Sequence, residues 1–70
     1  MQLTVNAEQL IVEDNLSISQ FIEWYRNQGY LEQENFAIAV NMEFVPRSIY
    51  SETYLRDFDK VEIVLPMQGG

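Results

Sequence analysis

The sequence predicts an α+β fold in which a mixed sheet of four or five strands packs on one amphipathic helix. Three observations support this class. The chain has 70 residues, which allows one domain with one small core. A helical pattern with start and stop signals occurs at residues 18–28, and short apolar runs lie on both sides of it. The first and the last of these runs are apolar enough to be central strands of a sheet whose one face the helix covers.

The N-terminal segment predicts a β-hairpin. Residues 1–5 alternate, with Met1, Leu3 and Val5 on one face. A polar break at residues 6–8 separates this run from a second apolar run at residues 9–12. Two short apolar runs with a brief polar gap are typical of paired antiparallel strands.

Both ends of the predicted helix are marked by residue type. Ser17 and Gln20 have the spacing of a capping box, in which each side chain satisfies a backbone N–H at the helix start. Gly29 stands where a left-handed residue ends a helix. Between them, apolar residues at helical spacing form one stripe: Ile18, Phe21, Ile22 and Tyr25. Trp24 falls outside this stripe, so we expect it to be exposed, although contact with a partner is the less favoured role for it.

The second half of the chain predicts further strands. Residues 35–41 alternate and form a third strand. Residues 44–45 form a short one, and Pro46, which lacks a backbone donor, places it at a sheet edge or strand end. Residues 48–55 have weak helical periodicity. Residues 60–65 form the last strand, whose two faces carry Val61, Ile63 and Leu65 on one side and Glu62 and Val64 on the other.

Composition argues against most catalytic classes. The chain has no cysteine and no histidine, which removes disulfides, thiolate nucleophiles, serine triads and the usual zinc sites. Asp57 and Asp59 lack the further spaced ligands of a calcium loop, which favours a solvated turn. The sequence therefore predicts a protein that is not an enzyme and that binds no cofactor or metal.

Charge and hydropathy limit the partners. A net charge of −7 disfavours nucleic acid and suits either solubility or steering toward a basic protein surface. No apolar run approaches the ~20 residues of a membrane span, and no signal peptide is present, so we expect no membrane contact and a cytoplasmic location. Four apolar residues are candidates for an interaction patch on the open sheet face, or for completing the core: Met42, Phe44, Phe58 and Met67.

The chain ends on Gly69 and Gly70, directly after the predicted last strand. At the average glycine frequency of about 7%, such a pair arises by chance in roughly 0.5% of chains; an engineering scar is another explanation. Glycine has no Cβ, so a diglycine segment can enter a narrow channel, and no side chain shields the terminal carboxylate. We therefore expect a rigid domain of residues 1–66 that presents a flexible diglycine tail of residues 67–70 as a substrate.

Three segments carry a family resemblance: residues 1–6, "AVNMEFVPR" at 39–47 and "DFDKVEIVLPMQGG" at 57–70. Together they resemble the ThiS family, the sulfur carriers of thiamine biosynthesis within the ubiquitin-like β-grasp superfamily, over essentially the whole chain. MoaD-type carriers share the diglycine, whereas Val45-Pro46-Arg47 after Asn41 favours ThiS. Phe58 departs from the pattern because relatives commonly have glycine in that turn, and Tyr50 stands where relatives often have tryptophan.

The resemblance implies a function and its residues. A ThiF-type adenylating enzyme would activate the carboxylate of Gly70 with ATP, and sulfur from a cysteine desulfurase would then produce a thiocarboxylate, 1-thioglycine, for the thiazole synthase ThiG. Gly69 would keep the tail slim, and Pro66, Met67 and Gln68 would set its exit from the sheet. The possible partner surface consists of Met42, Phe44 and Phe58.

Alternatives remain at this point. The same tail suits a sulfur carrier for molybdopterin synthesis, tRNA thiolation or amino-acid sulfuration. It also suits a ubiquitin-like modifier that forms isopeptide bonds to lysine. A binding domain whose terminal glycines have no role is the fourth reading.

Overall fold

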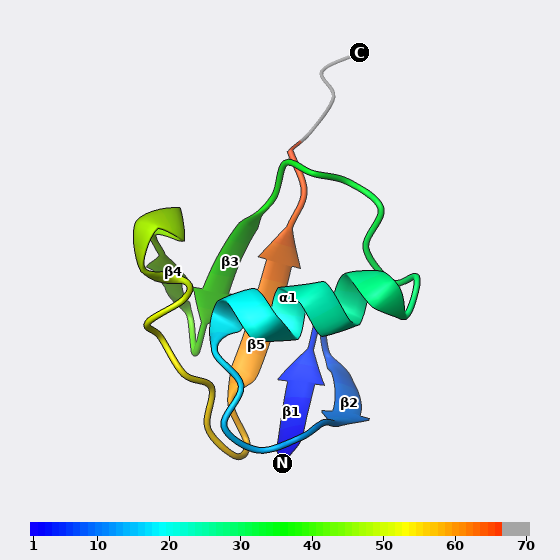
Figure 1. Ribbon diagram of the computed structural model, residues 1–70, viewed down its shortest axis with the longest axis vertical. Helices are drawn as coiled ribbons and strands as arrows, with labels where there is room; N and C mark the ends of the chain where they lie inside the picture. Colours follow the sequence, from blue (N-terminus) through cyan, green and yellow to red (C-terminus); the bar gives the residue numbers. More distant parts are fainter. Residues whose placement is uncertain (67–70) are drawn as a thin grey trace.

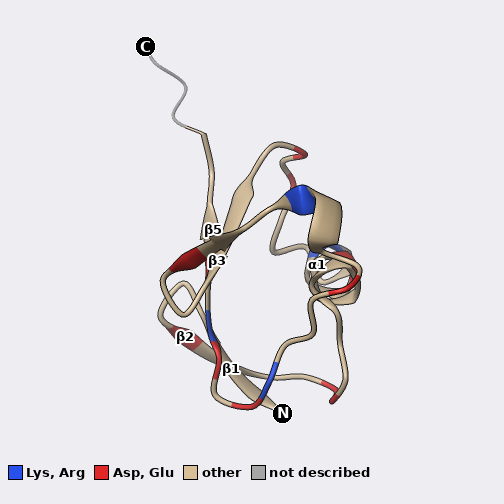
Figure 2. Cartoon of the chain, turned by 90° about the vertical axis from the view of Figure 1, so that its left-hand side faces the viewer, with Lys and Arg blue, Asp and Glu red and all other residues tan. Residues whose placement is uncertain are grey.

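The structure, a computed structural model, describes residues 1–66; residues 67–70 lie outside the described part. Figure 1 shows one helix crossing one face of a sheet. The elements in chain order are β1 (Gln2–Val5), β2 (Glu8–Ile11), α1 (Ile18–Asn27), β3 (Ala37–Val40), β4 (Glu43–Val45), the 3-10 helix η1 (Arg47–Ile49) and β5 (Lys60–Val64). Within residues 1–66, no helix covers the opposite face of the sheet, which we call the open face (Figures 1 and 2).

The sheet has five strands in the order β2-β1-β5-β3-β4. β1 and β5 pair in parallel, whereas the other neighbouring strands pair antiparallel. The first and last strands are therefore inner neighbours in a mixed sheet, as the sequence predicts. This arrangement, with one helix packed across the sheet, confirms the expected β-grasp fold.

The N-terminal hairpin closes through a two-residue turn. Asn6 and Ala7 have φ values of 48° and 71°, the left-handed pair that suits the twist of a tight hairpin. β2 consequently begins at Glu8, one residue earlier than predicted, and ends at Ile11. Val12, predicted as a strand residue, lies past the strand and is buried in the core.

The helix follows its sequence signals closely. The Oγ of Ser17 accepts the Gln20 N–H at 3.2 Å, and the Oε1 of Gln20 accepts the Ser17 N–H at 2.9 Å, so the predicted capping box is present. The helix ends at Asn27, one residue before the predicted end, and Gly29 takes a φ of 86°. Trp24 is half-buried and packs against the core, so the expectation that it is exposed was wrong.

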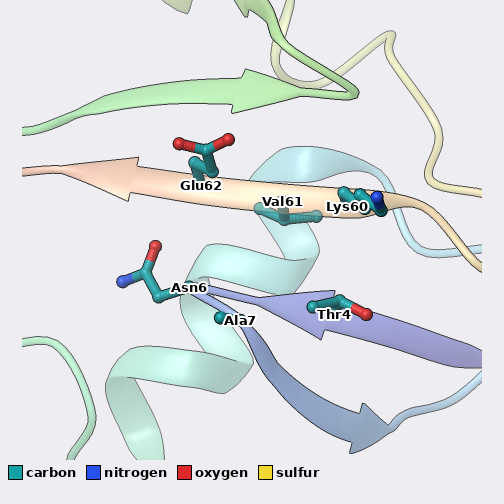
Figure 3. Close-up of a pocket in the computed structure, with 6 residues that line it drawn as sticks. All are labelled: Thr4, Asn6, Ala7, Lys60, Val61 and Glu62. Atoms are coloured by element: carbon teal, nitrogen blue, oxygen red, sulfur yellow. The ribbon is translucent and has the colours of Figure 1, made fainter.

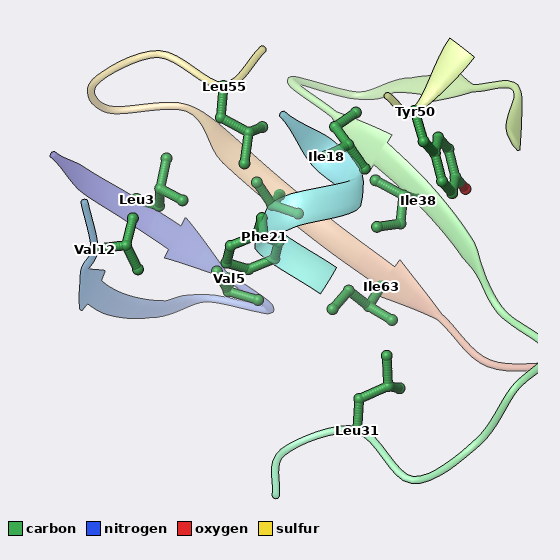
Figure 4. Close-up of a cluster of buried hydrophobic side chains, with 11 residues drawn as sticks. Leu3, Val5, Val12, Ile18, Phe21, Leu31, Ile38, Tyr50, Leu55 and Ile63 are labelled. Atoms are coloured by element: carbon green, nitrogen blue, oxygen red, sulfur yellow. The ribbon is translucent and has the colours of Figure 1, made fainter. Parts of the chain in front are cut away.

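The core lies between α1 and the sheet (Figure 4). Its buried side chains come from the alternating faces of the strands, from the helix stripe and from the connections: Leu3, Val5, Val12, Ile18, Phe21, Leu31, Ile38, Tyr50, Leu55, Val61 and Ile63. Full burial of one large apolar side chain contributes roughly 1.5–3 kcal/mol. Leu65 was expected to face the core with Val61 and Ile63; however, β5 ends at Val64, and Leu65 is 43% exposed.

The connection before β5 is tied to the start of the helix. Its helical part is η1 at Arg47–Ile49, which begins directly after Pro46 and is shorter than the predicted 48–55 turn. The chain then runs beside the helix start, where the Ile18 N–H donates to the Thr53 carbonyl at 2.9 Å and the Leu55 N–H donates to the Leu16 carbonyl at 2.9 Å. These bonds bring Tyr50 and Leu55 into the core.

Candidate functional site

The chain leaves the sheet beside a groove at the end of β5, which we call the tail-root groove. It has a volume of about 310 Å³ and is lined by Asn35, Phe36, Ala37, Arg47, Val64, Leu65 and Pro66. Pro66, predicted to set the exit of the tail, lies in this lining and is exposed. The other predicted tail residues, Met67, Gln68, Gly69 and Gly70, lie outside the described residues.

Arg47 forms one side of the tail-root groove. Its Nη2 donates to the carbonyl of Glu34 at 3.2 Å and to the carbonyl of Phe36 at 3.0 Å. Its guanidinium carbon also lies 5.0 Å from the centroid of the Phe36 ring, within the range of a cation–π contact. The sequence had indicated Arg47 only as part of a family motif, and no local pattern predicted this position.

An apolar strip on the open face leads toward the groove. The sheet register pairs Ala39 with Phe44, and Ala37 with Val64. Residues paired across two strands share a face of the sheet. Because side chains alternate along a strand and Ile38 and Ile63 face the core, the residues next to them in sequence face away from it. We call these four residues, Ala37, Ala39, Phe44 and Val64, the open-face patch. Phe44 is 69% exposed and Val64 is also exposed, whereas Ala39 is buried and pairs with the charged Glu62 on the same face. The exposed apolar surface of the patch therefore comes from Phe44 and Val64.

Met42, another predicted partner residue, occupies the turn between β3 and β4. It has a φ of 72° and is 86% exposed. The preceding Asn41 fixes the turn against the last strand, because its Oδ1 accepts the Lys60 N–H at 3.0 Å and its Nδ2 donates to Asp59 at 3.0 Å. Contact of Met42 with a partner stays a prediction.

Phe58 lies in the turn before β5, whereas Pro66 follows the other end of that strand. Its φ of 69° lies in the strained left-handed region that favours glycine. The turn is closed by the Asp59 N–H, which donates to the Arg56 carbonyl at 3.1 Å. The ring is 69% exposed. Phe58 lies in the turn before β5, whereas Phe44 lies in β4 opposite Ala39, and contact of Phe58 with a partner also stays a prediction.

The two aspartates of this turn accept backbone hydrogen bonds. Asp57 Oδ1 accepts the Gln2 N–H at 2.7 Å, and Asp59 Oδ2 accepts the Arg56 N–H at 2.8 Å. Their carboxylates therefore shape the turn. Over residues 1–66, no group of three or more His, Cys, Asp or Glu side chains could hold a metal ion.

A larger hollow, of about 420 Å³, lies on the open face between β1 and β5 (Figure 3). It is lined by Thr4, Asn6, Ala7, Lys60, Val61 and Glu62. The Asn6 amide oxygen is already engaged, because it accepts the Ile63 N–H at 2.8 Å. Lys60 and Glu62 give the hollow one positive and one negative side chain, which suits polar contact with another protein more than a reaction.

Acidic positions are spread over several parts of the chain, with few basic positions between them (Figure 2). The net charge of −7 thus belongs to the whole surface and not to one cluster. Among the described helices, none is long and apolar enough to cross a membrane.

Comparison with known proteins supplies the family. A model of the ThiS family matches residues 1–70. A crystal structure of a thiamine biosynthesis protein (ThiS) from Geobacter metallireducens superimposes with a TM-score of 0.78 at 28% identity, and the match covers 100% of both chains. The solution structure of a thiamine biosynthesis protein from the same organism gives a TM-score of 0.68 at 28% identity, covering 100% of this chain and 88% of the other.

Two protein sequences are also similar to the whole chain. The chain is 34% identical over 70 residues to a thiazole synthase from Paramagnetospirillum magneticum, and it spans 20% of the length of that protein. It is 31% identical over 70 residues to a protein called ycf40 from Porphyra purpurea, of which it covers 93%.

Proposed function

This chain belongs to the ThiS family, and we propose that it is a sulfur carrier whose Gly70 becomes a thiocarboxylate that donates sulfur to thiazole formation in thiamine biosynthesis. One observation carries the proposal: the family match extends over residues 1–70 and so includes Gly69 and Gly70. The β-grasp domain serves as the rigid body that presents this terminus to other proteins. In this role the chain is a substrate and not an enzyme.

The chemistry has two stages. An adenylating partner of the ThiF type joins the Gly70 carboxylate to AMP, and pyrophosphate leaves ATP. A persulfide sulfur from a cysteine desulfurase then attacks the activated carbonyl, AMP leaves, and a thiol reduces the resulting acyl disulfide to release the thiocarboxylate. The carboxylate oxygen that carried AMP departs with it, so one oxygen is replaced by one sulfur. Because glycine has no side chain, neither attack is blocked at the neighbouring Cα.

The open-face patch supports recognition by such partners. Phe44 and Val64 are exposed apolar side chains on the face that no helix within residues 1–66 covers. Apolar surface of this kind marks interaction sites on small proteins. The net charge of −7 adds long-range attraction toward a basic partner surface. Both features act at recognition, before the tail reaches the reacting groups.

A thiazole synthase is the proposed acceptor of the sulfur. The relative from Paramagnetospirillum magneticum is named thiazole synthase, and this chain matches a segment equal to 20% of it. The presence of a segment similar to this chain within a protein of that name favours close cooperation between sulfur carriage and thiazole synthesis. We expect this chain to meet a ThiG-type partner in the cytoplasm.

Intact-mass measurement tests the proposal. The chain is incubated with ATP, a ThiF-type enzyme and a cysteine desulfurase with cysteine, and we expect a mass increase equal to the replacement of one oxygen by one sulfur at Gly70. A matched control lacks Gly69 and Gly70 and should show no such increase, while its thermal melt stays unchanged. Conjugates to other proteins would identify a modifier instead, and an unchanged mass with every partner would contradict the proposal.

The enzyme that accepts the sulfur distinguishes a thiazole carrier from a carrier for another pathway. The thiocarboxylate form is offered to thiazole synthase or to molybdopterin synthase, and loss of its sulfur is followed by mass. Transfer only to the molybdopterin enzyme would contradict the thiazole assignment and retain the carrier assignment.

A further inference from the structure

Arg47 holds together a part of the chain that has no regular secondary structure. The segment before β3 follows a long connection from α1, and within it Glu34 and Phe36 both offer their carbonyls to the same Nη2 of Arg47. The guanidinium donates to two carbonyls and also stacks on the Phe36 ring. The two kinds of contact together restrict the segment 34–36 more than either would alone. Arg47 therefore ties the entrance of β3 to η1.

The Arg47–Phe36 pair separates two hollows. On one side lies the tail-root groove, with Val64, Leu65 and Pro66 in its lining. On the other side lies a hollow of about 320 Å³ lined by Ser19, Ile22, Phe36, Arg47 and Tyr50. The pair thus forms a common wall between the helix side of the molecule and the point where the chain leaves the sheet.

A second arginine provides a natural comparison. The guanidinium carbon of Arg26 lies 5.9 Å from the centroid of the same Phe36 ring. No hydrogen bond found in residues 1–66 joins Arg26 to the segment 34–36. The two arginines carry the same charge near the same ring, but only Arg47 is bonded to the carbonyls that shape the groove wall.

We propose that Arg47 is a positioning residue for the C-terminal tail. It holds the wall past which Leu65 and Pro66 leave β5, and so fixes the path on which the described chain leaves the sheet. This role rests on the proposed function, because it matters only if a partner takes up Gly70. A fixed exit path at Leu65 and Pro66 reduces the conformational freedom that is lost when a partner takes up the terminus.

Kinetics of activation give the first test. Arg47→Met keeps the aliphatic length and removes the donors. Arg26→Met changes the net charge equally near the same ring. With a ThiF-type enzyme and ATP, Arg47→Met should raise the KM for the carrier roughly three- to tenfold. Its kcat should change little, since the reacting carbonyl is untouched. Arg26→Met should keep the wild-type KM, and equal effects of the two variants would overturn the proposal.

A spin label gives a second test that needs no partner. The chain has no cysteine, so Gln68→Cys can be labelled uniquely. In the labelled protein that retains Arg47, we expect the label to broaden the amide signals of Asn35 and Ala37, which line the tail-root groove. The signals of Ser19 and Ile22, which line the hollow on the other side of the wall, should be broadened less. Arg47→Met should reduce this contrast and Arg26→Met should preserve it. An undiminished contrast in Arg47→Met would overturn the proposal.

Phe36→Leu guards against a folding artefact, because it retains an apolar side chain and removes only the ring beneath the guanidinium. It should change the KM and the label contrast in the same direction as Arg47→Met, by a smaller amount; wild-type values in a folded Phe36→Leu protein would argue against the wall. If no protein, wild type included, were adenylated or thiolated, the proposed function would fail, and the label contrast would still decide the role of Arg47.

Discussion

The side chain of Asn6 takes the place of a strand backbone carbonyl for Ile63. Its Oδ1 accepts the Ile63 N–H at 2.8 Å, although the two residues are 57 positions apart in the sequence. The β1–β5 ladder itself pairs only Thr4 with Lys60 and Val5 with Val61. The Asn6 N–H also donates to the Val61 carbonyl at 2.9 Å. One residue of the hairpin turn therefore extends the contact between the first and last strands.

Removal of this amide should destabilise the domain. Asn6→Ala leaves the partly buried Ile63 N–H without its acceptor, and we expect a loss of about 1–3 kcal/mol in the free energy of unfolding. Asn6→Asp is the matched control, because it retains an oxygen at the same place and tolerates the left-handed angle. Urea denaturation measures both, and equal stability of the two variants would show that the bond contributes nothing.

Glycine at position 58 should stabilise the fold. Phe58 has a φ of 69° and an exposed ring, so its side chain gives little packing in return for the strained angle. Phe58→Gly relieves the angle, whereas Phe58→Ala removes the same ring and keeps the strain. Urea denaturation should find the glycine variant more stable than the alanine variant by about 1 kcal/mol, after allowance for the entropy of glycine in the unfolded chain. A less stable glycine variant would argue against strain at this turn.

Truncation of Phe44 should separate recognition from stability. Phe44 is 69% exposed on the open-face patch, and Ile11 is 76% exposed at the distant edge strand β2. We expect Phe44→Ala to change the free energy of unfolding by less than about 0.5 kcal/mol. It should lower kcat/KM for adenylation about tenfold or more, as removal of an interface anchor does. Ile11→Ala is the control and should leave both quantities unchanged; an equal kinetic loss there would contradict a localised surface.

A methyl group at the terminus should slow activation. Gly70→Ala places a side chain beside the carboxylate that the partner must reach, and we expect the rate of adenylation to fall roughly ten- to hundredfold because the reacting atoms are displaced. Circular dichroism should report an unchanged melting temperature, since Gly70 lies beyond the domain of residues 1–66. Adenylation of this variant at the wild-type rate would refute the steric argument.

Local chemistry explains which elements were predictable. The capping box of Ser17 and Gln20, the helix stripe and Gly29 act within a few residues of one another, so the helix could be placed to within one residue. The strands followed from alternation. The hairpin turn was placed as closely, since the predicted break at residues 6–8 contains the observed turn at Asn6 and Ala7, although no residue type marked the left-handed angle of Ala7.

Tertiary contacts explain what was missed. Leu31, Tyr50 and Leu55 belong to the core but lie in connections without periodicity, and only the folded chain brings them to the helix and sheet. Val64 became part of the open-face patch because its cross-strand partner Ala37 is small and the face is uncovered. The position of the Arg47 guanidinium depends on carbonyls 11 and 13 positions away, which no sequence pattern near it indicates.

The inner position of β5 has a mechanical consequence. The chain to Gly70 continues directly from a strand that is held on both sides, by β1 and by β3. A pull on the C-terminus therefore loads two hydrogen-bonded ladders in shear at the same moment, and the strand cannot peel away one bond at a time as an edge strand would. A force applied at the C-terminal end of β5 is therefore resisted by both ladders together, and the domain stays folded under loads that would detach an edge strand.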